Sequence, residues 1–226
     1  MRGLFITGTD TGAGKTVLAA AIVAALRARG EPVQPLKPVL SGLDELADPA
    51  WPPDHELLAR AGGVDPGSVT LLRFGPAVSP HLAAELAGTP IDPAELEAQV
   101  RALARGGRTM IVEGVGGLLV PLAPGYDVRD FARELGLPVV IAARPGLGTI
   151  NHTLLTLEAA RAAGLDIAAV VLTPWPERPS VIERSNRETI ARLGAVAMAT
   201  LPRVSGAAAE ELAAAGAMLP VAQWLG

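Results

Sequence analysis

The feature that most restricts the fold of this chain is a series of short apolar runs without polar alternation. Runs of this kind suit strands that are buried on both faces, as in a parallel sheet with helices on both sides. They occur at residues 3–7, 108–114, 137–143, 167–173 and 195–202, and a further strand is predicted at 33–36. The pattern therefore predicts a mostly parallel sheet.

The segments between these runs have the apolar spacing of covering helices. Glycine after the last apolar residue is a common helix end, and this predicts helix ends at Gly30, Gly164 and Gly194. Helices are predicted at 16–29, 93–104, 127–135, 150–163, 181–193 and 206–217. The alternation predicts one doubly wound α/β domain over residues 1–226, with ligands at the carboxyl ends of the strands.

Composition narrows the class of partner. The net charge is -4 and no cluster of Lys and Arg is present, which argues against nucleic acid. The absence of cysteine excludes disulfides and thiolate zinc sites. No apolar run is long enough to span a membrane. We therefore expect a soluble, cytoplasmic protein that acts on small molecules.

The sequence GTDTGAGKT at residues 8–16 joins the first predicted strand to the first predicted helix. Backbone N–H groups of such a loop face a phosphate, Lys15 adds positive charge and the Thr16 hydroxyl can bind Mg²⁺. The usual spacing would place a glycine at position 9, whereas here Asp10 and Thr11 bring polar side chains into the loop. The alternative is a simple glycine turn between strand and helix.

Three charged residues stand near the same predicted edge of the sheet. Glu113 ends an apolar strand, where a carboxylate is costly unless it faces a cation, although an exposed strand-end acid is the alternative. Asp54 precedes a helical stretch, and its spacing alone favours a helix N-cap over a metal ligand. Lys37 follows a strand and is either an exposed lysine or a group that stabilises an anionic intermediate.

Several motifs together resemble the dethiobiotin synthetase family of P-loop NTPases, and the resemblance spans nearly the whole chain. They are GTDTGAGKT, KPVLSG, SPHLAA at 79–84, VEGVGGLLVPL and RPGLGTINHTLLT. The resemblance implies an ATP-dependent cyclo-ligase of biotin synthesis. Its substrate would be 7,8-diaminononanoate, in which one amine takes up CO₂ as a carbamate. ATP phosphorylates the carbamate, and the second amine attacks the mixed anhydride to close the ring and release phosphate.

The resemblance also implies roles for individual residues. Catalysis would use Lys37, Lys15 and Thr11, and Mg²⁺ would be held by Thr16, Asp54 and Glu113. The nucleotide would contact Gly12, Ala13, Gly14, Lys15, Thr16, Val17, Asp54, Glu113, Gly114, Val115 and Gly116. The substrate would contact Thr11, Lys37, Ser41, Gly117, Leu118, Gly148, Thr149, Ile150, Asn151 and Asn186. In the family the helix that starts at 149–150 and a residue near Asn186 serve the neighbouring subunit, which implies a homodimer.

One departure from the family concerns the nucleotide base. Family members often carry Asn after the fifth strand, whereas this chain has Thr173 and Pro174. A threonine offers one short hydroxyl and a proline has no N–H, so we expect poor discrimination among nucleoside triphosphates. The remaining wall of the base pocket is predicted at Pro202, Arg203 and Val204, with a surface role for Arg203 as the alternative. Residues 43–53 are interpreted as a loop on the active-site side, and His81 and His152 have no assigned role.

Two other functions fit the phosphate loop. An amidating synthetase related to cobyrinate amidation would usually bring a glutamine-hydrolysing domain with a cysteine nucleophile, and this chain has no cysteine. A nucleotide-switch ATPase of the chromosome- or septum-positioning type carries an additional lysine early in the loop, where this chain has Asp10. Both rank below the synthetase.

Overall fold

A six-stranded parallel sheet forms the centre of the molecule, in the order β10-β9-β8-β1-β5-β2. The computed structural model describes residues 1–45 and 51–226. The strands are β1 Gly3–Gly8, β2 Val33–Leu36, β5 Thr109–Glu113, β8 Val139–Ala143, β9 Ile167–Trp175 and β10 Met198–Pro202. The apolar runs all become strands of this sheet, which confirms the predicted fold class.

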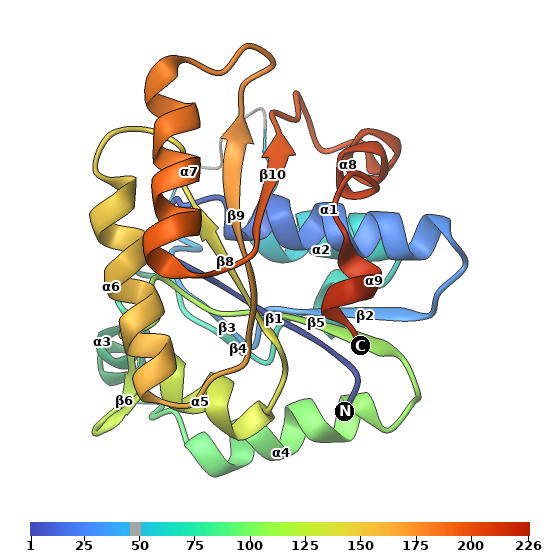
Figure 1. The fold of residues 1–226 in the computed structure, drawn as a ribbon. Coiled ribbons are helices and arrows are strands. Elements are labelled where there is room, and N and C mark those ends of the chain that lie inside the picture. Colours follow the sequence, from blue (N-terminus) through green and yellow to red (C-terminus); the bar gives the residue numbers. More distant parts are fainter. Residues whose placement is uncertain (46–50) are drawn as a thin grey trace.

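Helices cover both faces of the sheet, as Figure 1 shows. Successive side chains of a strand point to opposite faces, so Leu4 and Ile6 lie in one apolar cluster and Phe5 lies in the other. The first face is covered by α1 Lys15–Ala28, α2 Asp54–Gly62, α8 Ala209–Gly216 and α9 Val221–Trp224. The second is covered by α3 Pro80–Leu86, α4 Pro93–Ala104, α5 Val128–Leu135, α6 Thr149–Ala162 and α7 Val181–Gly194.

Helix α1 is enclosed by the rest of the fold. Every residue from Leu18 to Leu26 is buried, including five alanines that allow close contact with the neighbouring helices. At Gly216 of α8, an added Cβ would overlap the backbone carbonyl of Ala21. The two helices therefore pack backbone against backbone, and α1 is held rigidly behind the phosphate loop.

Several short elements carry too little periodicity to be predicted. They are the pairs β3 Val39–Leu40 with β4 Leu72–Arg73 and β6 Pro121–Ala123 with β7 Tyr126–Asp127, together with α3, α9 and the 3₁₀ turn Pro66–Ser68. No helix among the described residues is long and apolar enough to cross a membrane.

Helix α7 ends at Gly194, as predicted, but the left-handed conformation expected of this glycine was wrong. Gly194 is still helical, and the left-handed residue is Ala195, with φ 42°. An added Cβ at Gly194 would lie 2.7 Å from Cδ1 of Leu157 on α6. The glycine therefore permits close packing of α7 on α6 and does not supply the left-handed turn. Gly30 and Gly164 do have left-handed backbones directly after their helices, as predicted.

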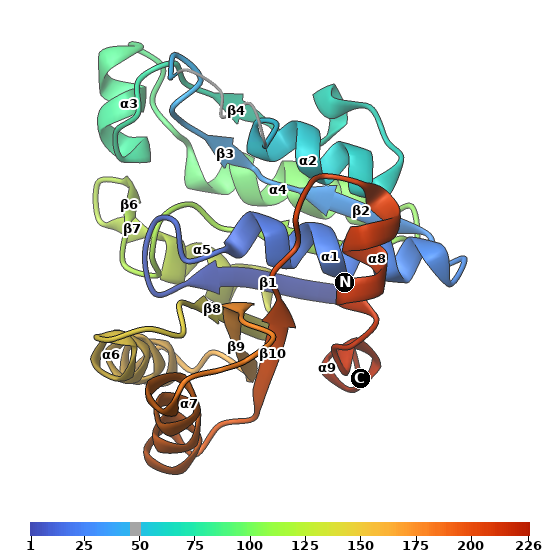
Figure 2. The same cartoon turned by 90° about the horizontal axis from the view of Figure 1, so that it is seen from above.

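The register of the central strands determines which side chains meet at the carboxyl edge of the sheet. Ile6 of β1 lies opposite Glu113 of β5, and Leu36 of β2 lies opposite Val112. Lys37 and Glu113 are thus neighbours just beyond the paired residues. Figure 2 shows β1 between the two halves of the sheet, with α1 directly after it. The phosphate loop lies at this edge, where doubly wound sheets bind their ligands.

Candidate active site

The phosphate loop runs from β1 into α1 with two glycines in the left-handed region. Gly12 has φ 70° and Gly14, the N-cap of α1, has φ 90°. No side chain caps α1, so its first N–H groups remain available to an anion. Lys15 is buried, and its Nζ donates to the backbone carbonyl of Asp10 at 3.0 Å. This is the local geometry that a phosphate-binding loop requires.

Lys37 joins two carboxylates that come from different parts of the chain. It follows β2, and its Nζ contacts Oδ2 of Asp54 at the start of α2 and lies 2.8 Å from Oε1 of Glu113 at the end of β5. The side chain of Lys37 is 5% exposed, and those of Asp54 and Glu113 are 42% and 0% exposed. The structure brings these three residues together, and the surface-residue alternatives for Glu113 and Lys37 are wrong.

The Thr16 hydroxyl completes this group, because its Oγ1 donates to Oε1 of Glu113 at 2.8 Å. Asp54 is the first residue of α2, whose N-cap is Pro53, and no side chain of the described residues caps that helix. The N-cap role that spacing favoured for Asp54 was therefore wrong. The reason is that Lys37 offers its carboxylate a buried cation, which outweighs capping of a half-exposed helix end.

Burial and charge act in opposite directions on these groups. Burial lowers the pKa of Lys37, but the charges of Glu113 and Asp54 outweigh it, and the net pKa is raised. Burial opposes ionisation of Asp54, yet Lys37 brings the pKa of that carboxyl below its ordinary value. Burial raises the pKa of Glu113 against the opposing charge of Lys37, and it lowers the pKa of Lys15. The ammonium and the Asp54 carboxylate are thus both charged at neutral pH.

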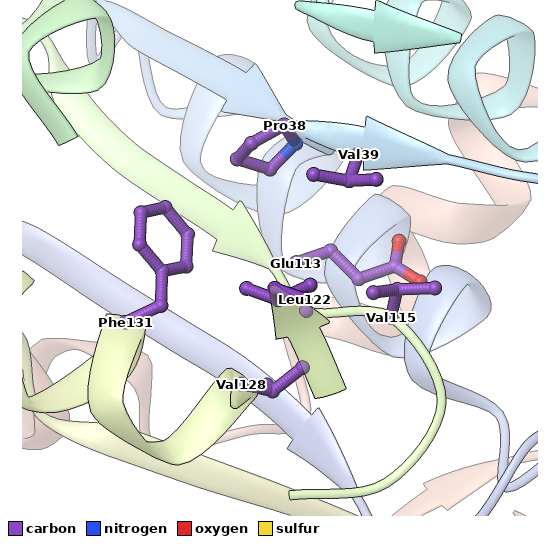
Figure 3. Close-up of a pocket in the computed structure, with 8 residues that line it drawn as sticks. Pro38, Val39, Glu113, Val115, Leu122, Val128 and Phe131 are labelled. Atoms are coloured by element: carbon purple, nitrogen blue, oxygen red, sulfur yellow. The ribbon is translucent and has the colours of Figure 1, made fainter. Parts of the chain in front are cut away.

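An apolar cavity of about 10 Å³ lies behind Glu113, lined by side chains of β3, α5 and the β6 strand. Figure 3 shows the Glu113 carboxylate on the side away from Phe131, with Val39 and Val115 beside it. Water has little access to Glu113 from the side of this small apolar cavity. Stabilisation of the carboxylate charge must therefore come from the side away from the cavity, where Lys37 and Thr16 lie.

The residues predicted to bind Mg²⁺ fit a hard cation. Oε2 of Glu113 is buried and accepts no hydrogen bond from the described part of the chain, which is costly for a carboxylate oxygen without a ligand. The Thr16 hydroxyl and the Asp54 carboxylate add two further oxygen donors of the type that Mg²⁺ prefers. No group of three or more His, Cys, Asp or Glu side chains suited to a metal occurs among the residues described. The donor set thus comprises two carboxylates and a hydroxyl.

Two cavities share Thr11 and Asp54 as lining residues. One, of about 370 Å³, is lined by the phosphate loop, Val17 and Trp51. The other, of about 580 Å³, is lined by Lys37, Ser41, Val115, Gly116 and residues of the SPHLAA motif, namely Ser79 and Pro80. Volumes of this size suit small molecules. The arrangement places one cavity on each side of Thr11, and Trp51, from the loop predicted at 43–53, lines the smaller one.

The predicted substrate residues beyond Gly116 lie apart from these two cavities. Gly117 and Leu118 line another cavity of about 380 Å³ together with His152, and His81 lines an apolar one of about 520 Å³. Gly148 has φ 89° and caps α6, whose first residues are Thr149, Ile150 and Asn151. Nδ2 of Asn186 donates to the carbonyls of Pro145 and Gly146 at 2.9 and 3.0 Å. Asn186 thus fixes the loop before α6, and its contact with substrate stays a prediction.

The predicted base pocket lies where β9 and β10 end. Thr173 is buried, and its Cγ2 lies 2.7 Å from the position that a Cβ on Gly14 would take. Val204 is buried in the core, Arg203 is exposed, and Pro174 and Pro202 are the neighbouring strand residues. Thr173 therefore supports the phosphate loop, and its role in base recognition stays a prediction.

Part of the predicted active-site loop lies outside the described residues, namely 46–50. Within the described part, Leu43, Glu45 and Pro53 line the 580 Å³ cavity, in agreement with the predicted position of residues 43–53.

Sequence reasoning also missed Arg144, which directly follows β8. Its Nε donates to the backbone carbonyl of Gly12 at 3.0 Å. Gly12 and Arg144 are 132 residues apart, so the local sequence around neither residue indicates this contact.

Comparison with known proteins agrees with this geometry. A family model described as an AAA domain matches residues 2–210. The ATP-dependent dethiobiotin synthetase BioD of Anaeromyxobacter sp. (strain Fw109-5) is 44% identical over 207 residues, covering 87% of this chain and 91% of the relative.

Two solved structures share the fold at lower identity. Cobyrinic acid a,c-diamide synthase from Mycobacterium smegmatis, solved with an ATP analog and magnesium, matches with a TM-score of 0.54 at 18% identity, covering 95% of this chain and 92% of that one. The cell division ATPase MinD of Pyrococcus furiosus also has a TM-score of 0.54, at 16% identity, covering 96% of this chain and 98% of that one. The fold is thus common to both alternative functions, whereas high identity over most of the length is found with the synthetases. The chain belongs to the ATP-dependent dethiobiotin synthetase family.

Proposed function

We propose that this protein is an ATP-dependent dethiobiotin synthetase that carboxylates 7,8-diaminononanoate with CO₂ and closes the cyclic urea. The observation that carries the proposal is the contact of Lys37 with Asp54 and Glu113 between two cavities, one at the phosphate loop and one lined by Ser41. A phosphoryl group at this point would pass from a nucleotide in the first cavity to a carbamate in the second.

The side chains of the site suit a reaction that needs positive charge and no protein nucleophile. The carbamate oxygen attacks the terminal phosphate of ATP, ADP leaves, and the second amine of the substrate displaces phosphate from the mixed anhydride. Lys15 and Lys37 stabilise the anionic groups, and Thr11 lines both of the cavities in which the two ligands would lie. The charges of Asp54 and Glu113 raise the pKa of Lys37 against the effect of burial, which favours its charged form at this site.

Mg²⁺ would be held by Thr16, Asp54 and Glu113. When bound, it neutralises phosphate charge and orients the triphosphate. The two carboxylates that now contact Lys37 are the same ones that would bind the ion.

The decisive experiment incubates the purified protein with the diamine, bicarbonate, Mg²⁺ and ATP and measures the cyclic urea by mass spectrometry. Dethiobiotin in molar proportion to ADP is the expected result. Phosphate release without the cyclic product would contradict the proposal and favour a nucleotide switch. Omission of the diamine is the control, and it should leave ATP largely unhydrolysed.

We also propose that two copies of the chain form a homodimer. Helix α6 and its preceding loop carry large apolar side chains that no described residue covers, with Leu147 97% exposed and Leu155 56% exposed. On α7, Val181, Ile182 and Leu193 are also exposed. Exposed apolar residues gathered on adjacent helices are typical of an interface between subunits.

We further propose weak selection of the nucleotide base. Thr173 is directed at Gly14, and the adjacent Pro174 has no N–H, so neither supplies the paired donor and acceptor that reads a base edge. The specificity constants for ATP, CTP and GTP are expected to lie close together. Measured side by side with saturating diamine, a preference of about a hundredfold for ATP would contradict this proposal.

A further inference from the structure

Arg144 lies beside the phosphate loop because of the register of β8 against β1. Gly8 pairs with Ala142, so the residues that follow both strands leave the sheet together. The guanidinium of Arg144 donates from Nε to the carbonyl of Gly12 at 3.0 Å, and its Nη2 lies 2.6 Å from where a Cβ on residue 12 would be. Glycine at position 12 is therefore needed both for its φ of 70° and for the approach of the guanidinium.

The other side of the Arg144 loop is fixed by α7. Asn186 is 7% exposed, and its amide donates to the carbonyls of both residues that follow Arg144. The segment 144–146 is therefore held between a buried amide and the phosphate loop. Arg144 itself is exposed, so no requirement of core packing accounts for its position.

The bond to Gly12 determines how the next peptide is oriented. A trans peptide is planar, so a carbonyl that points to Arg144 directs the N–H of Ala13 to the opposite side. That N–H donates to the carbonyl of Asp10 at 3.3 Å, the same atom that accepts from Lys15. Arg144 thus orients the peptide between Gly12 and Ala13, which lies just before Gly14 and the start of α1.

We infer that Arg144 is a positioning residue for nucleotide binding, which holds the phosphate loop in its anion-binding conformation through the carbonyl of Gly12. It acts on the loop and not on one phosphate of the ligand. The inference rests on the proposed binding of a nucleoside polyphosphate at this loop. It adds Arg144, which follows β8, to the phosphate-loop residues that follow β1.

The test compares Arg144→Met and Arg144→Lys with Arg29→Met, an exposed arginine at the end of α1 distant from the loop. Calorimetry gives the affinities for ADP and for a non-hydrolysable ATP analogue, and steady-state kinetics gives KM for nucleotide and for diamine. Loss of a charged donor predicts weaker binding of both nucleotides in Arg144→Met, by about five- to tenfold. Arg144→Lys keeps a donor and a charge and should restore most of the affinity, while Arg29→Met should match the wild type.

Three results would overturn the inference. The first is wild-type affinity for both nucleotides in Arg144→Met. The second is weaker binding of the triphosphate alone, which would indicate direct contact with the terminal phosphate. The third is an equal rise in KM for nucleotide and diamine with a lower melting temperature, which a purely structural role would produce. Since calorimetry needs no product, absence of dethiobiotin would contradict the proposed function and leave this test intact.

Discussion

Helices α1 and α6 have the same length and begin in the same way, yet they occupy different environments. Each has 14 residues, and each starts after a left-handed glycine, Gly14 with φ 90° or Gly148 with φ 89°, with no side-chain cap. Helix α1 is buried along most of its length, whereas α6 buries only Thr149, Thr153, Leu157 and Ala160. The comparison teaches that the same local geometry, a left-handed glycine and an uncapped first turn, can precede two helices that the rest of the fold buries to very different extents.

The largest effect is expected at the α1 end, where the chemistry lies. Lys37→Ala removes the cation between Asp54 and Glu113 and should lower turnover by about 10³-fold, while nucleotide binding is largely retained. Single-turnover ADP formation and calorimetry separate the two quantities. Because a buried carboxylate loses its partner, stability should fall as well, by about 3–5 kcal/mol. Folding is therefore verified by circular dichroism, and unchanged turnover in the folded variant would refute the catalytic role.

The second prediction compares substitutions at Gly14 and Gly148, the glycines that precede α1 and α6. Gly14→Ala places a methyl group 2.7 Å from Cγ2 of Thr173 in addition to the backbone strain, so we expect nucleotide affinity to fall by more than about a hundredfold. Gly148→Ala meets nothing within 4 Å and carries the strain alone, about 1 kcal/mol. It should alter KM for the diamine and leave nucleotide affinity unchanged. Equal losses of nucleotide affinity in both variants would remove the distinction between the two helix ends.

A third prediction concerns the exposed side of α6. Leu155→Asp places a charge on the proposed subunit interface and should shift the protein from dimer to monomer in sedimentation velocity, with a higher KM for the diamine. Leu86→Asp on α3 is the matched control, because Leu86 is 63% exposed and lies on a helix outside the proposed interface. If Leu155→Asp sediments as the wild type does, the α6 face is not the interface.

The smallest expected effect concerns α8, the helix that packs on α1. Oε1 of Glu211 on α8 accepts hydrogen bonds from N and Oγ of Ser205 at 2.6 and 2.7 Å, and these hold its pKa below the ordinary value of 4.5. A carboxyl whose pKa is lower in the folded state stabilises the fold above its unfolded pKa, and this contribution is lost as pH falls through the folded pKa. Glu211→Gln should therefore melt slightly lower than the wild type at pH 7. The difference should vanish in acid below the lowered pKa, and a gap that persists there would contradict this origin.

The sequence predicted the sheet well because buried strands and amphipathic helices are local signals. The apolar runs became β1, β5, β8, β9 and β10, and α4 has the predicted bounds. Phosphate binding was equally readable, since Gly14, Lys15 and Thr16 are adjacent in sequence. Strands of two or three residues such as β3 and β7 were missed, because they are too short to show a period.

Contacts between distant segments account for the remaining errors. Spacing alone favoured a helix cap for Asp54 because its neighbours in sequence describe a helix start, while its partner Lys37 is 17 positions away. Gly194 was interpreted as a left-handed helix stop because nothing local reveals Leu157. Arg144 was overlooked since its partner is a main-chain carbonyl, which every residue possesses. Tertiary packing overrides local preference at each of these positions.

The close packing of α8 on α1 also has a consequence for biosynthesis. The backbone of α1, at residues 15–28, meets Gly216, which leaves the ribosome about 190 residues later. Until then the apolar outer side of the first helix lacks its cover. A nonsense mutation or proteolytic cut before residue 209 would thus damage the phosphate-binding end of the enzyme, although every residue of that loop would be intact.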